Sequence, residues 1–196
     1  MNGLKKLFSK TYILASKSPR RAQLLNQIGL KFASIESNAK ELEYVNSDPV
    51  KIVKHNSLLK SRLVAVMFKK EIVIGADTIV VLNKRILNKP KNLLQAKSFL
   101  KTLSGKIHSV YTGVNIINTK NGNELFDYEM TKVHFRKLEN DEIDFYVKHF
   151  KPLDKAGAYG IQDDFGCLFI DKIEGDYYNI VGLPLLKLYK NLKKII

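Results

Sequence analysis

The chain contains one cysteine and no long apolar run, and each shortage excludes a class of protein. Cys167 alone cannot form an internal disulfide or a zinc site built from several cysteines. No window approaches the roughly 18–20 apolar residues of a transmembrane helix, and residues 12–15 are too few for a signal-peptide core. With 45% hydrophobic residues in 196, intrinsic disorder is excluded. We therefore expect a folded cytoplasmic protein with no membrane partner.

Acidic residues are outnumbered, since 33 lysines and arginines face 19 aspartates and glutamates and give a net charge of +14. Such a charge attracts polyanions, including nucleotides and nucleic acids. The lysines are scattered, however, and no nucleic-acid-binding motif or interleaving of basic and aromatic residues is present. Most of this charge is predicted to be a solvated surface, and a non-catalytic nucleic-acid-binding protein is kept as the competing class.

Hydrophobic periodicity predicts alternating strands and helices, and hence an α/β fold with one mixed sheet over residues 1–196. Hairpins interrupt the alternation, which favours mixed over fully parallel strand order. Expected strands cover 11–15, 71–76, 79–88 as a hairpin turning at 83–84, two segments flanking Asn121-Gly122, 166–173 and 177–181. Expected helices begin at Pro19, Pro49, after Asn92, at 140 and at Pro184.

The helix that begins at Pro49 is expected to run to about Lys69 and to bury an apolar stripe. The stripe consists of Val50, Val53, Leu59, Leu63, Val66 and Met67.

The first candidate site is the segment from Ser16 to Arg21, at the start of the helix capped by Ser18. A helix N-terminus presents backbone N–H groups and a positive dipole end, and Arg20 and Arg21 add charge. The segment is either a phosphate-binding site or an ordinary capped helix with surface arginines, and by itself it does not decide between them.

The second candidate is Asp77, predicted at the end of the apolar strand 71–76. A carboxylate at the rim of an α/β sheet can bind a metal or accept a proton. Glu41, Glu43, Lys60 and Lys89 are candidate companions, because polyphosphate hydrolysis needs acids for a divalent cation and cations for the phosphate oxygens. Taken singly, each is better explained as a surface charge.

The third candidate is the small-residue segment 155–162, where backbone can approach a ligand closely and Gln162 offers a donor and an acceptor for a base edge. A plain glycine-rich turn is the alternative. Cys167 is predicted to be a buried thiol in an apolar strand, and the four histidines lack the spacing of metal ligands.

Taken in order, six segments resemble the Maf family of nucleoside triphosphate pyrophosphatases from about Ile13 to the C-terminal helix. The segments are Leu-Ala-Ser-Lys-Ser-Pro-Arg-Arg (14–21), Gly-Ala-Asp-Thr-Ile-Val (75–80), Asn-Lys-Pro (88–90), Leu-Ser-Gly-Lys-Ile-His-Ser-Val-Tyr-Thr-Gly-Val (103–114), Ala-Gly-Ala-Tyr-Gly-Ile-Gln (156–162) and Gly-Asp-Tyr-Tyr-Asn-Ile-Val-Gly-Leu-Pro (175–184).

The resemblance implies a fold with two lobes flanking a nucleotide-binding cleft, as in Maf and Ham1 proteins. It also implies hydrolysis of a nucleoside triphosphate to the monophosphate and pyrophosphate with a divalent cation, Mg²⁺ or Mn²⁺. Asp77 would be the proton acceptor and, with Glu41, a metal ligand. Residues implied in substrate binding are Ser16, Arg20, Arg21, Lys60, Thr78, Lys89 and Gln162.

Within the family, the branch that acts on dTTP and UTP is similar to this chain at Arg21, Thr78 and Gln162. Ordinary or modified pyrimidine nucleotides are therefore the expected substrates, and the 7-methyl-GTP branch is the alternative. The resemblance is also compatible with a homodimer and with a role in septum formation, for which the residues give no independent argument.

Overall fold

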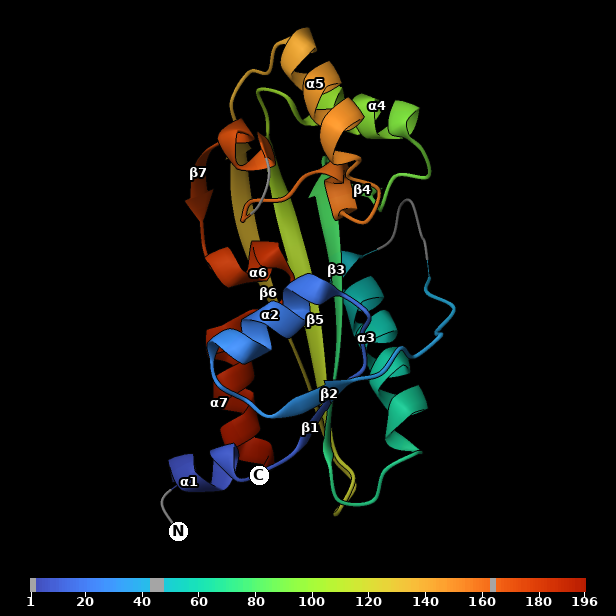
Figure 1. Cartoon of the computed structure of the whole chain (residues 1–196), viewed down its shortest axis with the longest axis vertical. Coiled ribbons are helices and arrows are strands. Elements are labelled where there is room, and N and C mark those ends of the chain that lie inside the picture. The colour runs from blue at the N-terminus through green and yellow to red at the C-terminus, as the bar shows by residue number, and fades with distance from the viewer. Residues whose placement is uncertain (1–2, 43–47, 163–164) are drawn as a thin grey trace.

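A seven-stranded mixed sheet forms the centre of the computed structural model, which describes residues 3–42, 48–162 and 165–196 (Figure 1). The strand order is β2-β1-β3-β5-β6-β7, and β4 pairs with one end of β3. Strands β1 and β2 are parallel to their neighbours and the others are antiparallel, so the predicted mixed α/β sheet is confirmed. The strands are β1 (Tyr12–Leu14), β2 (Phe32–Ser34), β3 (Ile72–Leu82), β4 (Arg85–Leu87), β5 (Ile107–Asn118), β6 (Asn123–Phe135) and β7 (Ile170–Glu174).

Helices cover both faces of this sheet, and the alternation of side chains along β3 shows which helix lies on which face. Ile72 and Ile74 pack in a core with α2 and α7, whereas Val73 packs in a second core with α3. Near the β4 end of the sheet, α4 and α5 enclose a third core that contains Val80. The helices are α1 (Gly3–Phe8), α2 (Pro19–Gln27), α3 (Pro49–Ala65), α4 (Leu93–Leu103), α5 (Asn140–Phe150), α6 (Tyr177–Val181) and α7 (Leu185–Ile195).

Strand β3 differs from the prediction in a way that matters for Asp77. One continuous strand runs through the position where a strand end was expected, and Asp77 lies in its middle, opposite Gly113 of β5. On the other edge of β3, the pairing with β1 extends only as far as Ile74, and the pairing with β4 begins only at Val80. Residues 75–79 therefore have no strand partner among the described residues on that edge. This notch opens the centre of the sheet to a ligand.

Helix α3 buries a different face from the one predicted. Val53 is buried and Leu63 is exposed, while Val66 and Met67, predicted within the helix, are exposed beyond its end at Ala65. The face that meets the sheet is largely small or polar, with Asn56, Ser57, Lys60 and Ser61 among its buried residues. A hydrophobic-stripe prediction fails in the middle of the helix, because this part packs against glycines and a carboxylate, whereas Val53 and Val64 nearer its ends pack in apolar cores.

Close packing explains why those residues are small. A Cβ atom added at Gly75 would lie 2.4 Å from the Ser57 carbonyl oxygen, and one added at Gly113 would lie 2.6 Å from the Val53 carbonyl oxygen. The glycines let α3 approach the sheet more closely than side chains would allow. This approach brings the polar face of α3 within hydrogen-bonding distance of β3.

Two C-terminal predictions are wrong. The segment 177–181, expected to be a strand, is helix α6, whose N-cap Asp176 accepts hydrogen bonds from the Tyr178 and Asn179 backbone N–H groups. The expected strand 166–173 begins instead as a 3-10 helix (Phe165–Phe169) and becomes β7 only at Ile170. Cys167 is consequently exposed and not a buried core thiol.

Two turns and the start of α4 were predicted correctly. The β3–β4 hairpin turns at Asn83 and Lys84, both with positive φ, and Gly122 has φ +74° in the β5–β6 turn. The side chain of Asn92 caps α4. Within the described ranges, none of the helices combines the length and apolar content needed to cross a bilayer.

Candidate active site

A cavity of about 420 Å³ lies at the notch in the sheet and is lined by the residues that the family resemblance assigned to the site. Its wall draws on the β1–α2 connection, α3, β3, the segment after β4, and residues 154–162. The predicted residues on it are Ser16, Arg20, Arg21, Glu41, Lys60, Asp77, Thr78, Lys89 and Gln162. Glu43, a further candidate, lies outside the described residues.

Asp77 is held from the α3 side by two hydrogen-bond donors. Lys60 Nζ lies 2.6 Å from one carboxylate oxygen, and Asn56 Nδ2 donates to the other at 3.1 Å. Asn56 is itself fixed, because it accepts from the Leu42 backbone N–H and donates to the Leu42 carbonyl. With a donor on each oxygen, the buried carboxylate keeps one orientation toward the cavity.

Lys60 joins this carboxylate to a second one. Its ammonium lies 3.0 Å from Glu41 Oε1, so one buried cation bridges Glu41 and Asp77. Across the described parts of the chain, no cluster of three or more His, Cys, Asp and Glu side chains is arranged to hold a metal ion. Glu36 and Asp154 also line the cavity but pair with Lys17 and Arg20, so Glu41 and Asp77 are the two carboxylates that meet at one cation there.

The start of α2 faces the same cavity, with Ser18, Pro19 and Arg20 on its wall. Ser18 is the N-cap, but its side chain makes no capping hydrogen bond. Ser16 Oγ accepts from the Ser18 backbone N–H and from Arg21 Nη1, each at 3.2 Å. Its own hydroxyl hydrogen can therefore point to a ligand oxygen.

Arg21 is buried and fixed by three hydrogen bonds. Nε donates to the Gly182 carbonyl at 2.9 Å, Nη1 donates to Ser16 Oγ, and Nη2 donates to Thr78 Oγ1 at 3.0 Å. Burial lowers the pKa of Arg21, while the charges of Asp77 and Glu41 oppose that shift. An arginine remains protonated under such a shift, so a fixed positive charge stands in the cavity wall.

Arg20 pairs with Asp154, from the segment across the cavity. Its Nη1 contacts the Asp154 carboxylate, and its Nη2 donates to the Asp154 carbonyl at 3.2 Å. Partial burial alone would raise the pKa of Asp154, but the hydrogen bond and charge of Arg20, with the charge of Lys155, outweigh it and lower this pKa. Lys155 donates to the same carboxylate at 3.1 Å.

Lys89 lies on the cavity wall with its side chain exposed overall. Desolvation of the ammonium group lowers its pKa, Glu41 opposes the shift, and Arg21 and Lys60 add to it. Three predicted cations, Lys60, Lys89 and Arg21, therefore act on one another through the same cavity. Gathered positive charge of this kind favours a polyanionic ligand.

Gln162 places on the cavity wall a carbonyl oxygen that has no hydrogen-bond donor in the described part of the chain. Its Oε1 is buried and has no hydrogen-bond partner within the described residues. A buried carbonyl oxygen without a donor costs free energy, and a ligand N–H can supply the missing partner.

Comparison with protein families matches residues 11–195 to the model described as Maf-like protein. The chain belongs to the Maf-like protein family. The match spans the whole notch and cavity, so the resemblance carried by the six sequence segments is confirmed.

Curated relatives of this Maf-like chain agree in length and share about half of its residues. A protein of Thermoanaerobacter sp. (strain X514), named dTTP/UTP pyrophosphatase, is 49% identical over 183 residues, covering 93% of this chain and 95% of the relative. Proteins of the same name from Bacillus cytotoxicus and Bacillus anthracis are 46% identical over 94% of this chain (95% of the relative) and 49% identical over 93% (94% of the relative). Among solved structures, the Staphylococcus aureus Ham1 protein matches with a TM-score of 0.45 and 13% identity, covering 64% of this chain and 72% of that chain.

Sequence reasoning missed several side chains that hold the site of this Maf-like protein together. Asn56 could have been found, because it lies four residues before Lys60 and so on the same helix face. Asp154 could not have been assigned, since only the folded chain brings it to Arg20.

A buried pair, His108 and Tyr159, supports the segment that carries Gln162. Tyr159 lines the cavity, and its hydroxyl lies 2.7 Å from His108 Nε2. Burial lowers the pKa of His108 to about 4, and the nearby His134 acts in the same direction. The ring is therefore neutral at physiological pH and has a structural role, as expected for a histidine without metal-ligand spacing.

The lowered pKa of His108 predicts that the folded protein loses stability in acid. The unfolded histidine takes up a proton below about pH 6.5 and the folded one only below about pH 4, so acidification over this window destabilises the fold by up to about 3 kcal/mol. Urea unfolding at pH 7, 5.5 and 4.5 measures this loss, which should shrink in His108→Gln. The exposed His55→Gln is the control. Equal acid sensitivity in wild type and His108→Gln would contradict the assignment.

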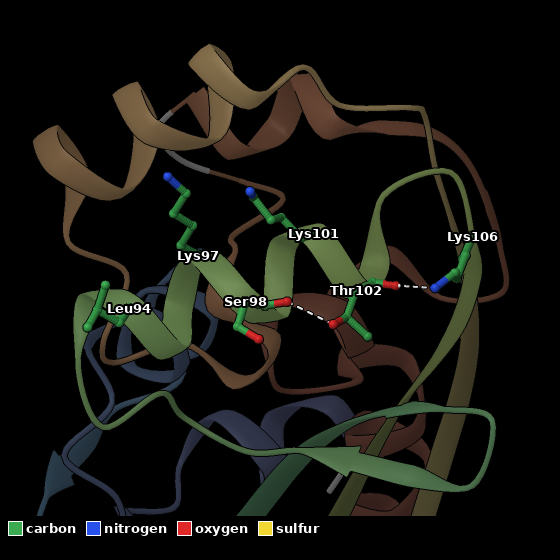
Figure 2. Close-up of a pocket in the computed structure, with 6 residues that line it drawn as sticks. All are labelled: Leu94, Lys97, Ser98, Lys101, Thr102 and Lys106. Carbon is green, nitrogen blue, oxygen red and sulfur yellow. Dashed lines mark hydrogen bonds between the residues drawn. The ribbon is translucent and has the colours of Figure 1, made fainter.

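A second, open depression lies on α4 and the turn after it, away from the predicted residues (Figure 2). Lys97 forms an ion pair with Asp144 of α5, and Lys106 donates to the Thr102 carbonyl. The depression is lined by Leu94, Lys97, Ser98, Lys101, Thr102 and Lys106. Among the described residues, its wall carries no acidic or amide side chain, unlike that of the cavity at the notch.

Proposed function

We propose that this chain hydrolyses dTTP and UTP to the monophosphate and pyrophosphate. The observation that carries the proposal is Asp77, a buried carboxylate oriented by Lys60 and Asn56 in the same cavity as Arg20, Arg21 and Lys89. The relatives named dTTP/UTP pyrophosphatase, at 45–49% identity over most of the chain, support the same reaction.

Phosphate binding is assigned to the cations and to the α2 N-terminus. A nucleoside triphosphate carries several negative charges, and stabilising the charge that develops on the departing pyrophosphate is most of the catalytic task. Arg20, Lys60 and Lys89 supply positive charge, and the Ser16 hydroxyl and the first N–H groups of α2 supply hydrogen bonds.

Asp77 is assigned as the base. Water attacks the α-phosphorus, a new oxygen–phosphorus bond forms, and the bond from the α-phosphorus to the bridging oxygen breaks. Asp77 accepts the proton of the attacking water, and pyrophosphate leaves with the bridging oxygen. Because Lys60 and Asn56 hold both carboxylate oxygens, the base is already oriented before substrate binds.

Glu41 and Asp77 fit a divalent cation shared with the substrate. Mg²⁺ is commonly bound by one or two carboxylates together with substrate phosphates and water, and this cavity offers two carboxylates that Lys60 bridges. When bound, Mg²⁺ or Mn²⁺ would neutralise phosphate charge and polarise the phosphoryl group.

Pyrimidine selectivity is assigned to Gln162 and Arg21. Uracil and thymine present an N3–H donor between two carbonyl acceptors. The buried Gln162 Oε1 lacks a donor within the described chain, and Arg21 has guanidinium N–H groups beyond the three engaged by protein, so the two groups complement that edge.

Pyrophosphate release across dTTP, UTP, CTP, ATP, GTP and 7-methyl-GTP, with Mg²⁺ or Mn²⁺, tests the proposal. We expect kcat/KM for dTTP and UTP to exceed that for the other nucleotides by at least about tenfold, because an unpaired buried polar group penalises the wrong base. Activity should disappear when the cation is chelated.

The alternatives give different outcomes in the same assay. Preference for 7-methyl-GTP would keep the hydrolase and overturn the pyrimidine assignment. No turnover with any nucleotide would favour the nucleic-acid-binding class, which further predicts binding that weakens steeply with salt.

We also propose a cytoplasmic location and a homodimer. Light scattering on the purified chain tests the homodimer.

A further inference from the structure

A buried threonine behind the cavity is hydrogen-bonded to the hydroxyl group of Thr78. Thr112 on β5 is fully buried and lies opposite Thr78 of β3 in the antiparallel register. Their hydroxyl oxygens are 2.9 Å apart, and Thr112 is not on the cavity wall. Thr78, by contrast, lines the cavity and contacts Arg21.

The direction of this hydrogen bond follows from counting hydrogens. A threonine hydroxyl has one hydrogen to donate and two lone pairs. Thr112 donates its hydrogen to the backbone carbonyl of Asn179 at 3.0 Å, since a carbonyl oxygen can only accept. In the reverse arrangement Thr112 would donate to Thr78 and Thr78 to the Gly182 carbonyl, which exchanges a 3.0 Å hydrogen bond for one of 3.4 Å. The arrangement with the shorter bonds uses the hydrogen of Thr78 for the 2.9 Å contact, so this hydrogen points away from the cavity and toward Thr112.

Asn179 anchors this arrangement from α6. Its side-chain amide donates to the Val110 carbonyl at 3.0 Å and to Thr131 Oγ1 at 2.9 Å, and the residue is fully buried. Thr112 thus donates to a carbonyl that α6 and two strands keep in place.

With its hydrogen committed, Thr78 presents only lone pairs toward Arg21. It accepts from Arg21 Nη2 at 3.0 Å, while Arg21 Nε holds the Gly182 carbonyl. If Thr112 could not accept, the Thr78 hydrogen would turn to the Gly182 carbonyl, 3.4 Å away, or into the cavity. Either movement would disturb the orientation of Arg21 or add a donor to the wall.

We infer that Thr112 is a specificity-determining positioning residue, which keeps the Thr78 hydrogen out of the cavity so that Arg21 stays aimed at a base carbonyl. The inference rests on the proposed function. It assigns to Thr112 the discrimination between uracil, with a carbonyl at position 4, and cytosine, with an amino group there.

Thr112→Val tests the inference, because valine keeps the shape and removes the hydroxyl. We expect the UTP-to-CTP ratio of kcat/KM to fall about 5–10-fold, the worth of one hydrogen bond, mainly through a higher KM for UTP and with kcat changed less than about threefold. Thr112→Ser, which restores a hydroxyl, should recover most of the ratio. The preference for UMP over CMP, measured as the ratio of their calorimetric Kd values, should fall in Thr112→Val and recover in Thr112→Ser.

Thr131→Val is the matched control. Thr131 is also buried, and its hydroxyl accepts a hydrogen bond from the Asn179 side chain. This hydroxyl bonds to the Asp176 backbone and not to Thr78. The control should lower the melting temperature and leave the UTP-to-CTP ratio within about twofold. An equal loss of selectivity in Thr131→Val would show that loosening of α6 is the cause and would overturn the inference.

The two proposals fail in different ways. A wild-type protein without turnover of UTP or dTTP would overturn the proposed function, and the UMP and CMP affinities would then decide the role of Thr112. An active Thr112→Val with the wild-type UTP-to-CTP ratio would overturn the inference alone.

Discussion

Asp77→Asn is expected to lower kcat for dTTP and UTP hydrolysis by about 10²–10⁴-fold, the usual contribution of a positioned general base. The amide has nearly the shape of the carboxylate but cannot accept a proton. It also turns an NH₂ group toward Lys60 or Asn56, both of which are donors. Asn56 cannot simply reverse its own amide, because Leu42 holds both of its polar atoms.

Initial rates at saturating nucleotide, with the metal concentration varied, measure the Asp77 effect. Asp144→Asn is the matched control, since Asp144 also pairs with a lysine but lies on α5, outside the cavity. The control should keep wild-type kcat. Asp77→Asn with near-normal turnover and unchanged metal dependence would contradict both roles assigned to Asp77.

Gly75→Ala is expected to cost more stability than the roughly 1–3 kcal/mol typical of an overpacked core, and to lower kcat in the protein that still folds. The new methyl group would lie 2.4 Å from the Ser57 carbonyl oxygen and 2.8 Å from Ser61 Cβ. Backbone cannot swing aside as a flexible side chain can. Helix α3 must therefore move away from β3 and withdraw Lys60 and Asn56 from Asp77.

Urea unfolding and kcat, measured on the same preparation, test this coupling of packing to chemistry. Gly3→Ala is the control, because a Cβ there meets nothing within 4 Å. It should leave stability within about 0.5 kcal/mol, as surface substitutions generally do. An unchanged unfolding midpoint in Gly75→Ala would mean that α3 is not held against the sheet by this glycine.

Local signals allowed much of the fold to be predicted. Pro19 behind the Ser18 cap, Asn92 before α4 and Gly122 in the hairpin each fix local backbone geometry through their own chemistry. Helix α6 was missed although Asp176 caps it, because the apolar and aromatic residues of 177–181 also suit a strand. A short apolar segment is ambiguous in this way until its neighbours are known.

The site residues were predicted through motif resemblance, and the structure gathers all of them on one cavity wall. The position of Asp77 was not predicted correctly. It lies within a long strand and reaches the cavity only because β1 stops opposite Ile74 and β4 ends opposite Val80. Where a neighbouring strand ends is a property of the sheet, so the sequence around Asp77 carries no sign of it.

The amino-acid sequence by itself therefore determined the family, the α/β class and the identity of the reactive side chains, because these depend on local motifs and periodicity. Only the tertiary structure decided which partners those side chains have. Asn56 and Lys60 reach Asp77 because Gly75 and Gly113 let α3 approach, and Thr112 directs Thr78 because β3 and β5 pair in one register. Hydrogen bonds act over about 3 Å, and only folding brings residues so distant in sequence that close.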